Sequence, residues 1–99
     1  MNIQLLVDAT KKPLKYFDLK DILIVKICMK KPSTTSMIRE SLKDFGINLN
    51  IEAIRKRVKR LTEIGLLLED SYPKIYKFNP QTIGVWNKIL LKIEELVIK

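Results

Sequence analysis

One stretch of the chain, residues 50–80, constrains the fold most, because a helical pattern in it stops at a glycine and leads directly into a hairpin pattern. Over 51–64, apolar residues at spacings of three and four share one helix face; they are Ile51, Ile54, Val58 and Leu61. Gly65 ends this helix, and two short apolar runs then flank a turn that contains Pro73. The second run alternates as a strand does, and Asn79-Pro80 ends it. The sequence therefore predicts a helix followed by a two-stranded hairpin.

Two helices are predicted before this unit, and the first of them is the more apolar. It begins at Asp18, which with Asp21 resembles a capping box, and it ends near Lys30 because Pro32 stops it. Its residues 19–29 are apolar almost all round, a pattern typical of a centrally buried helix.

The second helix begins after Ser33 or Thr34, either of which can serve as its N-cap. Gly46 is placed for the left-handed residue that commonly follows a helix. The face expected to be buried holds Met37, Ile38, Leu42 and Phe45. A turn over 47–50 then joins this helix to the one predicted over 51–64.

The last helix is predicted from about Gln81 to Ile98 and carries a wide apolar arc. Five residues repeat at the spacing of a coiled-coil seam: Ile83, Trp86, Leu90, Ile93 and Val97. Val85, Ile89 and Leu96 lie beside the seam and widen the arc. One neighbour does not cover so wide an arc, so we expect this helix to pack on its own domain and also to pair with a second chain. The expected dimer contacts are Ile83, Trp86, Ile89, Leu90, Ile93, Leu96 and Val97.

The chain of 99 residues leaves room for one domain, which we expect to span 1–99. Within it, 18–80 is expected to hold the core and 81–99 the C-terminal helix. The segment 1–17 contains an apolar run, Ile3 to Val7, that allows either a short strand or a helical turn.

The charge balance indicates a polyanionic partner. Nineteen Lys and Arg residues against eleven Asp and Glu give a formal charge of +8, which favours nucleic acid or an acidic membrane surface. No run of apolar residues is long enough to span a membrane, and the N-terminus does not read as a signal peptide.

The residue types that the chain lacks exclude whole classes of chemistry. Without histidine, neither Ser–His nor Cys–His catalysis nor a histidine-containing zinc site is possible. A single cysteine, Cys28, forms no internal disulfide or thiolate cluster and fits a reducing, cytoplasmic location; we expect a buried, inert thiol. None of the three glycines lies in a phosphate-binding motif. We therefore expect no enzyme, no cofactor and no metal site.

The order helix, helix, helix, hairpin, helix resembles the winged helix-turn-helix family of transcription regulators. The residues that carry the resemblance are Phe45-Gly46-Ile47 at the turn, 50–61 as recognition helix, and 65–69 with 75–80 as the two sides of the wing. The pattern RLxxxGLL followed by YxFNP is similar to that of MarR- and ArsR-like regulators of prokaryotes and their viruses, so an archaeal or viral source is expected. The resemblance implies a mostly α fold with a small β-hairpin, a winged helix-turn-helix with a C-terminal dimerisation helix.

Together, the resemblance and the charge imply a homodimer that binds double-stranded DNA. The recognition helix, 51–64, would lie in the major groove and the wing, 66–78, near the minor groove. The first turns of the recognition helix would read bases, whereas Lys59 and Arg60, farther along it, would contact phosphates. The wing tip and the hydroxyls at the start of the second helix would also contact phosphates. The candidate DNA-binding residues are Ser33, Thr34, Thr35, Asn48, Asn50, Glu52, Arg55, Lys56, Arg57, Lys59, Arg60, Tyr72 and Lys74.

Two other interpretations stay open at this level. The basic face of the helix over 51–64 can simply be solvated, without any partner. Alternatively, the winged helix can serve as a protein-interaction module within a larger assembly. The basic charge of this face favours DNA over a protein partner.

Overall fold

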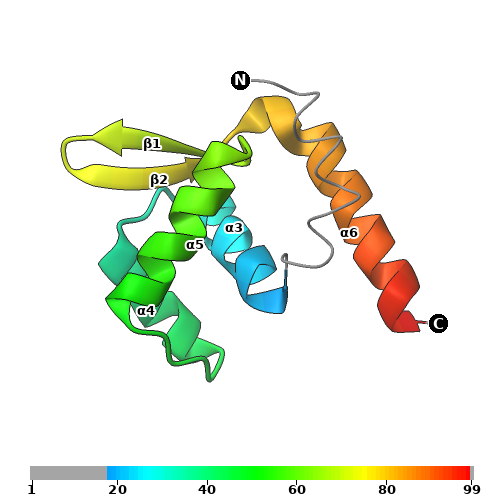
Figure 1. The fold of residues 1–99 in the computed structure, drawn as a ribbon, viewed down its shortest axis with the longest axis horizontal. Coiled ribbons are helices and arrows are strands. Elements are labelled where there is room, and N and C mark those ends of the chain that lie inside the picture. Colours follow the sequence, from blue (N-terminus) through cyan, green and yellow to red (C-terminus); the bar gives the residue numbers. More distant parts are fainter. Residues whose placement is uncertain (1–17, 99) are drawn as a thin grey trace.

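The computed structural model describes residues 18–98, so the expectation for the apolar run near the N-terminus lies outside the described residues. In chain order the elements are α3 (Leu19–Lys30), α4 (Thr35–Asp44), α5 (Ile51–Glu63), β1 (Leu67–Ser71), β2 (Lys74–Phe78), a 3-10 turn (Pro80–Thr82) and α6 (Ile83–Ile98) (Figure 1). The two strands pair in antiparallel fashion after the third of these helices. This is a winged-helix-like topology, and it confirms the predicted fold class of a mostly helical chain with one hairpin.

The first three of the four predicted helices each begin at a cap that the sequence indicates. Asp18 and Asp21 form a capping box, in which each carboxylate accepts the other residue's backbone N–H, at 3.0 and 3.2 Å. Thr34 Oγ1 accepts the N–H of Met37 at 3.2 Å, and Asn50 Oδ1 accepts that of Ala53 at 2.8 Å. These bonds fix where α3, α4 and α5 begin.

Two glycines end α4 and α5 in the left-handed conformation. Gly46 has φ 75° and Gly65 has φ 90°. A residue with a Cβ would be strained at these angles, whereas glycine is not. The left-handed conformation of Gly65 turns the chain from α5 directly into β1, and as a result Leu66 and Leu67 enter the core.

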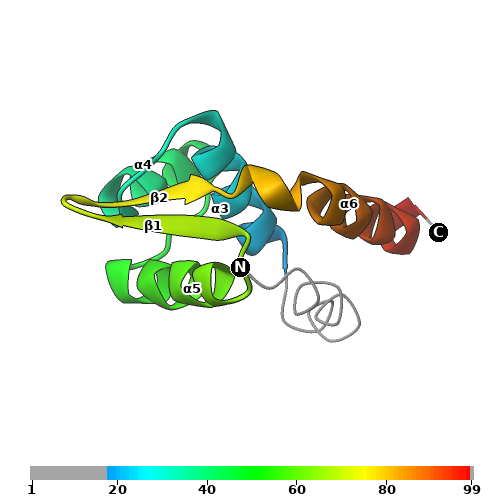
Figure 2. The ribbon, with the colours of Figure 1, turned by 90° about the horizontal axis from the view of Figure 1, so that it is seen from above.

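The core lies around α3, with α4 on one side and α5 on the other (Figure 2). Its fully buried side chains come from α3, α4, α5, the start of the hairpin and α6, and include Ile24, Val25, Ile38, Leu42, Ile54, Val58, Leu61, Leu66, Leu67 and Trp86. Expectations of burial are wrong at the helix ends, which the neighbouring helices do not cover. The exposed side chains are Leu19 and Met29 of α3, at 65% and 40%, Met37 in the first turn of α4, at 37%, and Phe45 after α4, at 60%.

The hairpin pairs Leu67 with Phe78 at its base and Ser71 with Lys74 at its tip. The segment before α4 joins its outer edge, because Ser33 and Tyr76 exchange two backbone hydrogen bonds of 2.9 and 2.8 Å. The hairpin is therefore tied to the helices from both ends of the helix-turn-helix pair.

The C-terminal helix differs from the prediction at its start and in its buried stripe. Asn79 caps a 3-10 turn through Gln81, so the α-helix begins at Ile83. The coiled-coil seam is wrong at its first position: Ile83 is 45% exposed, whereas Trp86 and Ile89 are buried. The reason is that Trp86 packs edge-to-face on Phe78 of β2, with ring centroids 6.3 Å apart, and this contact sets the rotation of the helix.

Candidate nucleic-acid interface

The outward face of α5 is polar and fully accessible. Burial of Ile54, Val58 and Leu61 turns the opposite side of the helix to solvent. The exposed residues are Glu52, Arg55, Lys56, Lys59 and Glu63. These five residues form the part of the predicted recognition helix that is open to an external partner.

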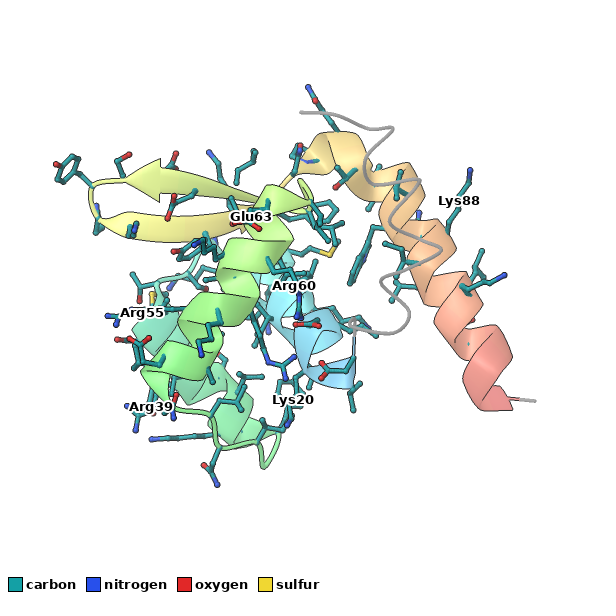
Figure 3. The ribbon with its side chains drawn as sticks, viewed as in Figure 1. Lys20, Arg39, Arg55, Arg60, Glu63 and Lys88 are labelled. Atoms are coloured by element: carbon teal, nitrogen blue, oxygen red, sulfur yellow. The ribbon has the colours of Figure 1, made fainter. Side chains whose placement is uncertain are left out.

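Arg57 and Arg60 reach from α5 to the first turn of α3. Arg57 Nη1 donates to Asp18 Oδ1 at 2.8 Å and to Asp21 Oδ1 at 3.0 Å, and Arg60 Nη2 donates to Asp21 Oδ2 at 2.6 Å. Asp21 is fully buried. Figure 3 shows Arg60 beside α3, with Arg55 on the other side of α5. These contacts connect residues 36 to 39 positions apart, so no local sequence pattern indicates them.

The pKa values of the two carboxyls in this cluster are shifted in opposite directions. Burial raises the pKa of Asp21, and the hydrogen bond from Arg57 and the charge of Arg60 only partly offset that effect. At the more accessible Asp18, burial also acts to raise the pKa, but hydrogen bonds from Arg57 and from the N–H of Asp21 outweigh it and lower the pKa.

This cluster changes the charge that α5 offers to a partner. Arg57 and Arg60 are engaged with carboxylates, and Arg55 forms an exposed pair with Glu52 at 2.8 Å. Among the side chains that the structure describes, Lys56 and Lys59 form no ion pair. These two lysines are therefore the cations of α5 most available to an external anion.

The hairpin presents an aromatic tip and paired charges. Tyr72 is 97% exposed at the turn. Lys74 Nζ lies 3.6 Å from Glu69 Oε1, and Lys77 Nζ lies 3.4 Å from Asp70 Oδ2. Such exposed pairs are weak, so Lys74, whose side chain is 70% exposed, can exchange its partner at little cost.

The start of α4 presents fewer hydroxyl groups for phosphate contacts than the sequence predicted. Ser33 is only 3% exposed, and its hydroxyl donates to the carbonyl of Lys31 at 2.8 Å, so it does not lie on the surface. Thr34 uses its hydroxyl as N-cap, and Thr35 is half-exposed. Asn48 and Asn50, at the turn before α5, are exposed.

The residues expected at a dimer interface are divided by the fold. Trp86 and Ile89 are buried within the single chain, while Leu90 is half-buried and Ile83 is exposed. The side chains of Ile93, Leu96 and Val97 lie outside the described ones. In residues 18–98 no helix has the length and apolar character that crossing a bilayer requires. The same part of the chain holds no group of three or more metal-ligating side chains.

Comparison of the chain with protein-family models, with curated proteins and with solved structures gives no match. The winged-helix-like assignment accordingly rests on the order and contacts of the elements.

Proposed function

We propose that this protein is a sequence-specific, double-stranded DNA-binding regulator of transcription that acts as a homodimer. The observation that carries the proposal is the outer face of α5, where Lys56 and Lys59 are exposed and unpaired among the described side chains. The net charge of +8 agrees with a polyanionic partner. In this proposal α5 enters the major groove and the hairpin lies near the minor groove, as in MarR- and ArsR-like regulators of prokaryotes and their viruses, and the protein acts in the cytoplasm as a non-enzyme.

The positions of the side chains suggest separate tasks within this interface. Asn50 and Lys56 lie in the first turns of α5, where a helix in the major groove reaches base edges. Lys59 and Lys74 lie farther from that end, on α5 and at the wing tip, and suit phosphate contacts. Tyr72, with its ring in solvent, can pack on sugar and backbone.

Selection from random duplex oligonucleotides with the purified protein is the direct experiment. We expect a palindromic consensus, because a two-fold symmetric dimer would bind two inverted half-sites, which in helix-turn-helix dimers lie about 34 Å, one turn of the duplex, apart. Recovery of random sequence only would overturn the sequence-specific function.

The salt dependence of binding then tests which cations meet phosphate. The slope of log affinity against log salt is about −0.9 per phosphate contacted, so Lys74→Gln should reduce its magnitude by about 0.9 for each copy bound. Lys43→Gln is the matched control, since it removes one positive charge from α4, where Lys43 already pairs with Glu40 at 3.2 Å. We expect the control to leave the slope unchanged.

Base reading is separated from phosphate binding by competition. Lys56→Ala should lower affinity for the selected duplex more than for random duplex, whereas Lys74→Ala should lower both alike. Equal losses on both duplexes for both variants would contradict the placement of α5 in the groove.

A protein-interaction module within a larger assembly is the second candidate function. The neutral hairpin favours it, because Lys74 and Lys77 are balanced by Glu69 and Asp70 on the facing strand. A flat salt response together with weak binding to every duplex would favour this candidate over the DNA-binding regulator.

A further inference from the structure

A groove of about 990 Å³ runs between α3 and α4. Its floor is apolar: Leu23 and Ile27 of α3 are half-buried, and Met37 and Phe45 are 37% and 60% exposed. All the described residues that line it belong to α3, to α4 or to the segments that follow these two helices, and none comes from α5. The groove is thus separate from the proposed DNA-binding face.

The two walls of the groove carry opposite charges. Lys26 and Lys30 form a basic wall on α3, and Glu40 and Asp44 form an acidic wall on α4. Within each wall the two charges are four residues apart, so they repeat about every 6 Å along the helix. Glu40 pairs with Lys43 at the surface, a contact weak enough to be exchanged for another cation.

The outer face of α6 carries the complementary pattern. Leu91 is 59% exposed, on the side of the helix opposite the buried Trp86 and Ile89. Among the side chains of α6 that the structure describes, and counted at about 100° per residue, the exposed Lys88 and Lys92 flank Leu91 on one side, and the exposed Glu94 flanks it on the other. Figure 3 shows Lys88 on the side of α6 that faces away from the other helices.

We propose that the outer face of α6 of one copy docks in the α3–α4 groove of a second copy, with Leu91 on the apolar floor. Lys88 and Lys92, which have the same four-residue spacing as the acidic wall, then face that wall, while Glu94 faces the basic wall. Figure 2 shows α6 extending away from α3, α4 and α5, which leaves this face accessible to another molecule. Each copy supplies one helix and one groove, so a reciprocal exchange gives a closed dimer when a two-fold axis relates the two copies.

A second copy is the proposed occupant because both charged flanks of α6 complement the two charged walls of the groove. A helix with one basic and one acidic flank around an apolar centre is the shape of ligand that these walls require, and the chain itself contains one. The inference rests on the homodimer of the proposed function but not on DNA binding, so it is tested without DNA.

The experiment is a charge-reversal exchange followed by sedimentation of the full chain. The wall variant carries Glu40→Lys and Asp44→Lys, and the helix variant carries Lys88→Glu and Lys92→Glu. Each variant alone places like charges together, so its dimer should be weaker than that of the wild type by about tenfold or more. An equimolar mixture should form a heterodimer of wild-type strength, because each helix then meets a wall of opposite charge.

Two further variants make the outcome decisive. Leu91→Ser should weaken the wild-type dimer without reducing helical circular dichroism. Glu63→Lys with Asp70→Lys, a double reversal at exposed sites outside the groove, should leave dimerisation unchanged. If the wild type dimerises but the mixture of the two reversed variants does not, the groove is not the docking site, although the homodimer stands. A wild type that stays monomeric through the micromolar range overturns both, and this is also the result expected if another part of the same chain fills the groove.

Discussion

Arg60 Nη2 of α5 lies 2.6 Å from Oδ2 of Asp21, a fully buried carboxylate in the first turn of α3. Arg57 donates to the same carboxylate from one turn earlier on α5. The cluster therefore joins the helix proposed to read DNA to the central helix of the core, and it fixes their relative rotation.

Asp21→Asn tests how much this contact stabilises the fold. The variant leaves two guanidinium groups without their buried anion, but both can turn toward water because their side chains are 21% and 42% exposed. Burial raises the pKa of Asp21, so its charge alone does not stabilise the fold; the loss comes from hydrogen bonds, because an amide has one acceptor oxygen for two guanidinium groups. We therefore expect the free energy of unfolding to fall by about 1 kcal/mol. Glu63→Gln, at an exposed carboxylate outside the α3–α4 groove, should change it by less than about 0.5 kcal/mol. Denaturant titration of both variants is the measurement, and similar values for the two would show that the cluster is not stabilising.

Asp18 gives this cluster a dependence on pH. Its pKa in the folded chain is lowered from 3.8, so its ionised form stabilises the fold above that value, and the contribution disappears as pH falls through the folded pKa. Asp18→Asn keeps an N-cap side chain but not the charge. The difference in unfolding free energy between wild type and this variant should thus shrink between pH 5 and pH 2; a constant difference would exclude the ionic contribution.

Asn50 is expected to act in stability as well as in recognition. Asn50 Oδ1 caps α5 by accepting the N–H of Ala53 at 2.8 Å. Asn50→Ala should therefore lower the free energy of unfolding by about 1 kcal/mol, whereas Asn50→Ser should lower it by only a few tenths of a kcal/mol. If Asn50 also reads a base, the Ser variant will lose sequence preference while its thermal stability stays close to that of the wild type. Loss of preference only in the Ala variant would assign Asn50 to capping alone.

Gly46 and Gly84 form a matched pair for the same substitution. A Cβ at either position meets no atom within 4 Å, so backbone conformation alone decides the effect. Gly46→Ala should destabilise by about 1 kcal/mol, because φ is +75° there, and Gly84→Ala in α6 should stabilise by about 0.5 kcal/mol. Thermal unfolding of the two variants should therefore shift in opposite directions.

Cys28 should be unreactive in the folded protein. Burial raises its pKa to about 12, and its side chain is 2% exposed. At pH 8 the thiolate fraction is then on the order of 10⁻⁴, so a thiol reagent should label the native chain only as fast as it unfolds. Ser71→Cys adds an exposed thiol and should be labelled at once. Rapid labelling of Cys28 without denaturant would mean that α3 is not central to the core.

The local features of this fold were predictable because neighbouring residues decide them. Caps at Asp18, Thr34 and Asn50 and the left-handed turns at Gly46 and Gly65 depend on hydrogen bonds and dihedral angles within a few positions. The order of helices and hairpin followed from these signals together with hydrophobic periodicity. For the same reason the sequence indicated which side of α5 faces outward and that this side is basic.

Tertiary packing decided what the periodicity left undetermined. Nothing local indicates that Asp21 meets Arg57 and Arg60, or that Trp86 packs on Phe78 and turns Ile83 outward, because these partners become neighbours only after the helices assemble. Likewise, the apolar floor and charged walls of the α3–α4 groove come from residues on two helices whose spacing is set by the core. The sequence by itself therefore determined the elements and the sign of the charge on α5, whereas the tertiary structure decided which of its cations face solvent and which face a carboxylate.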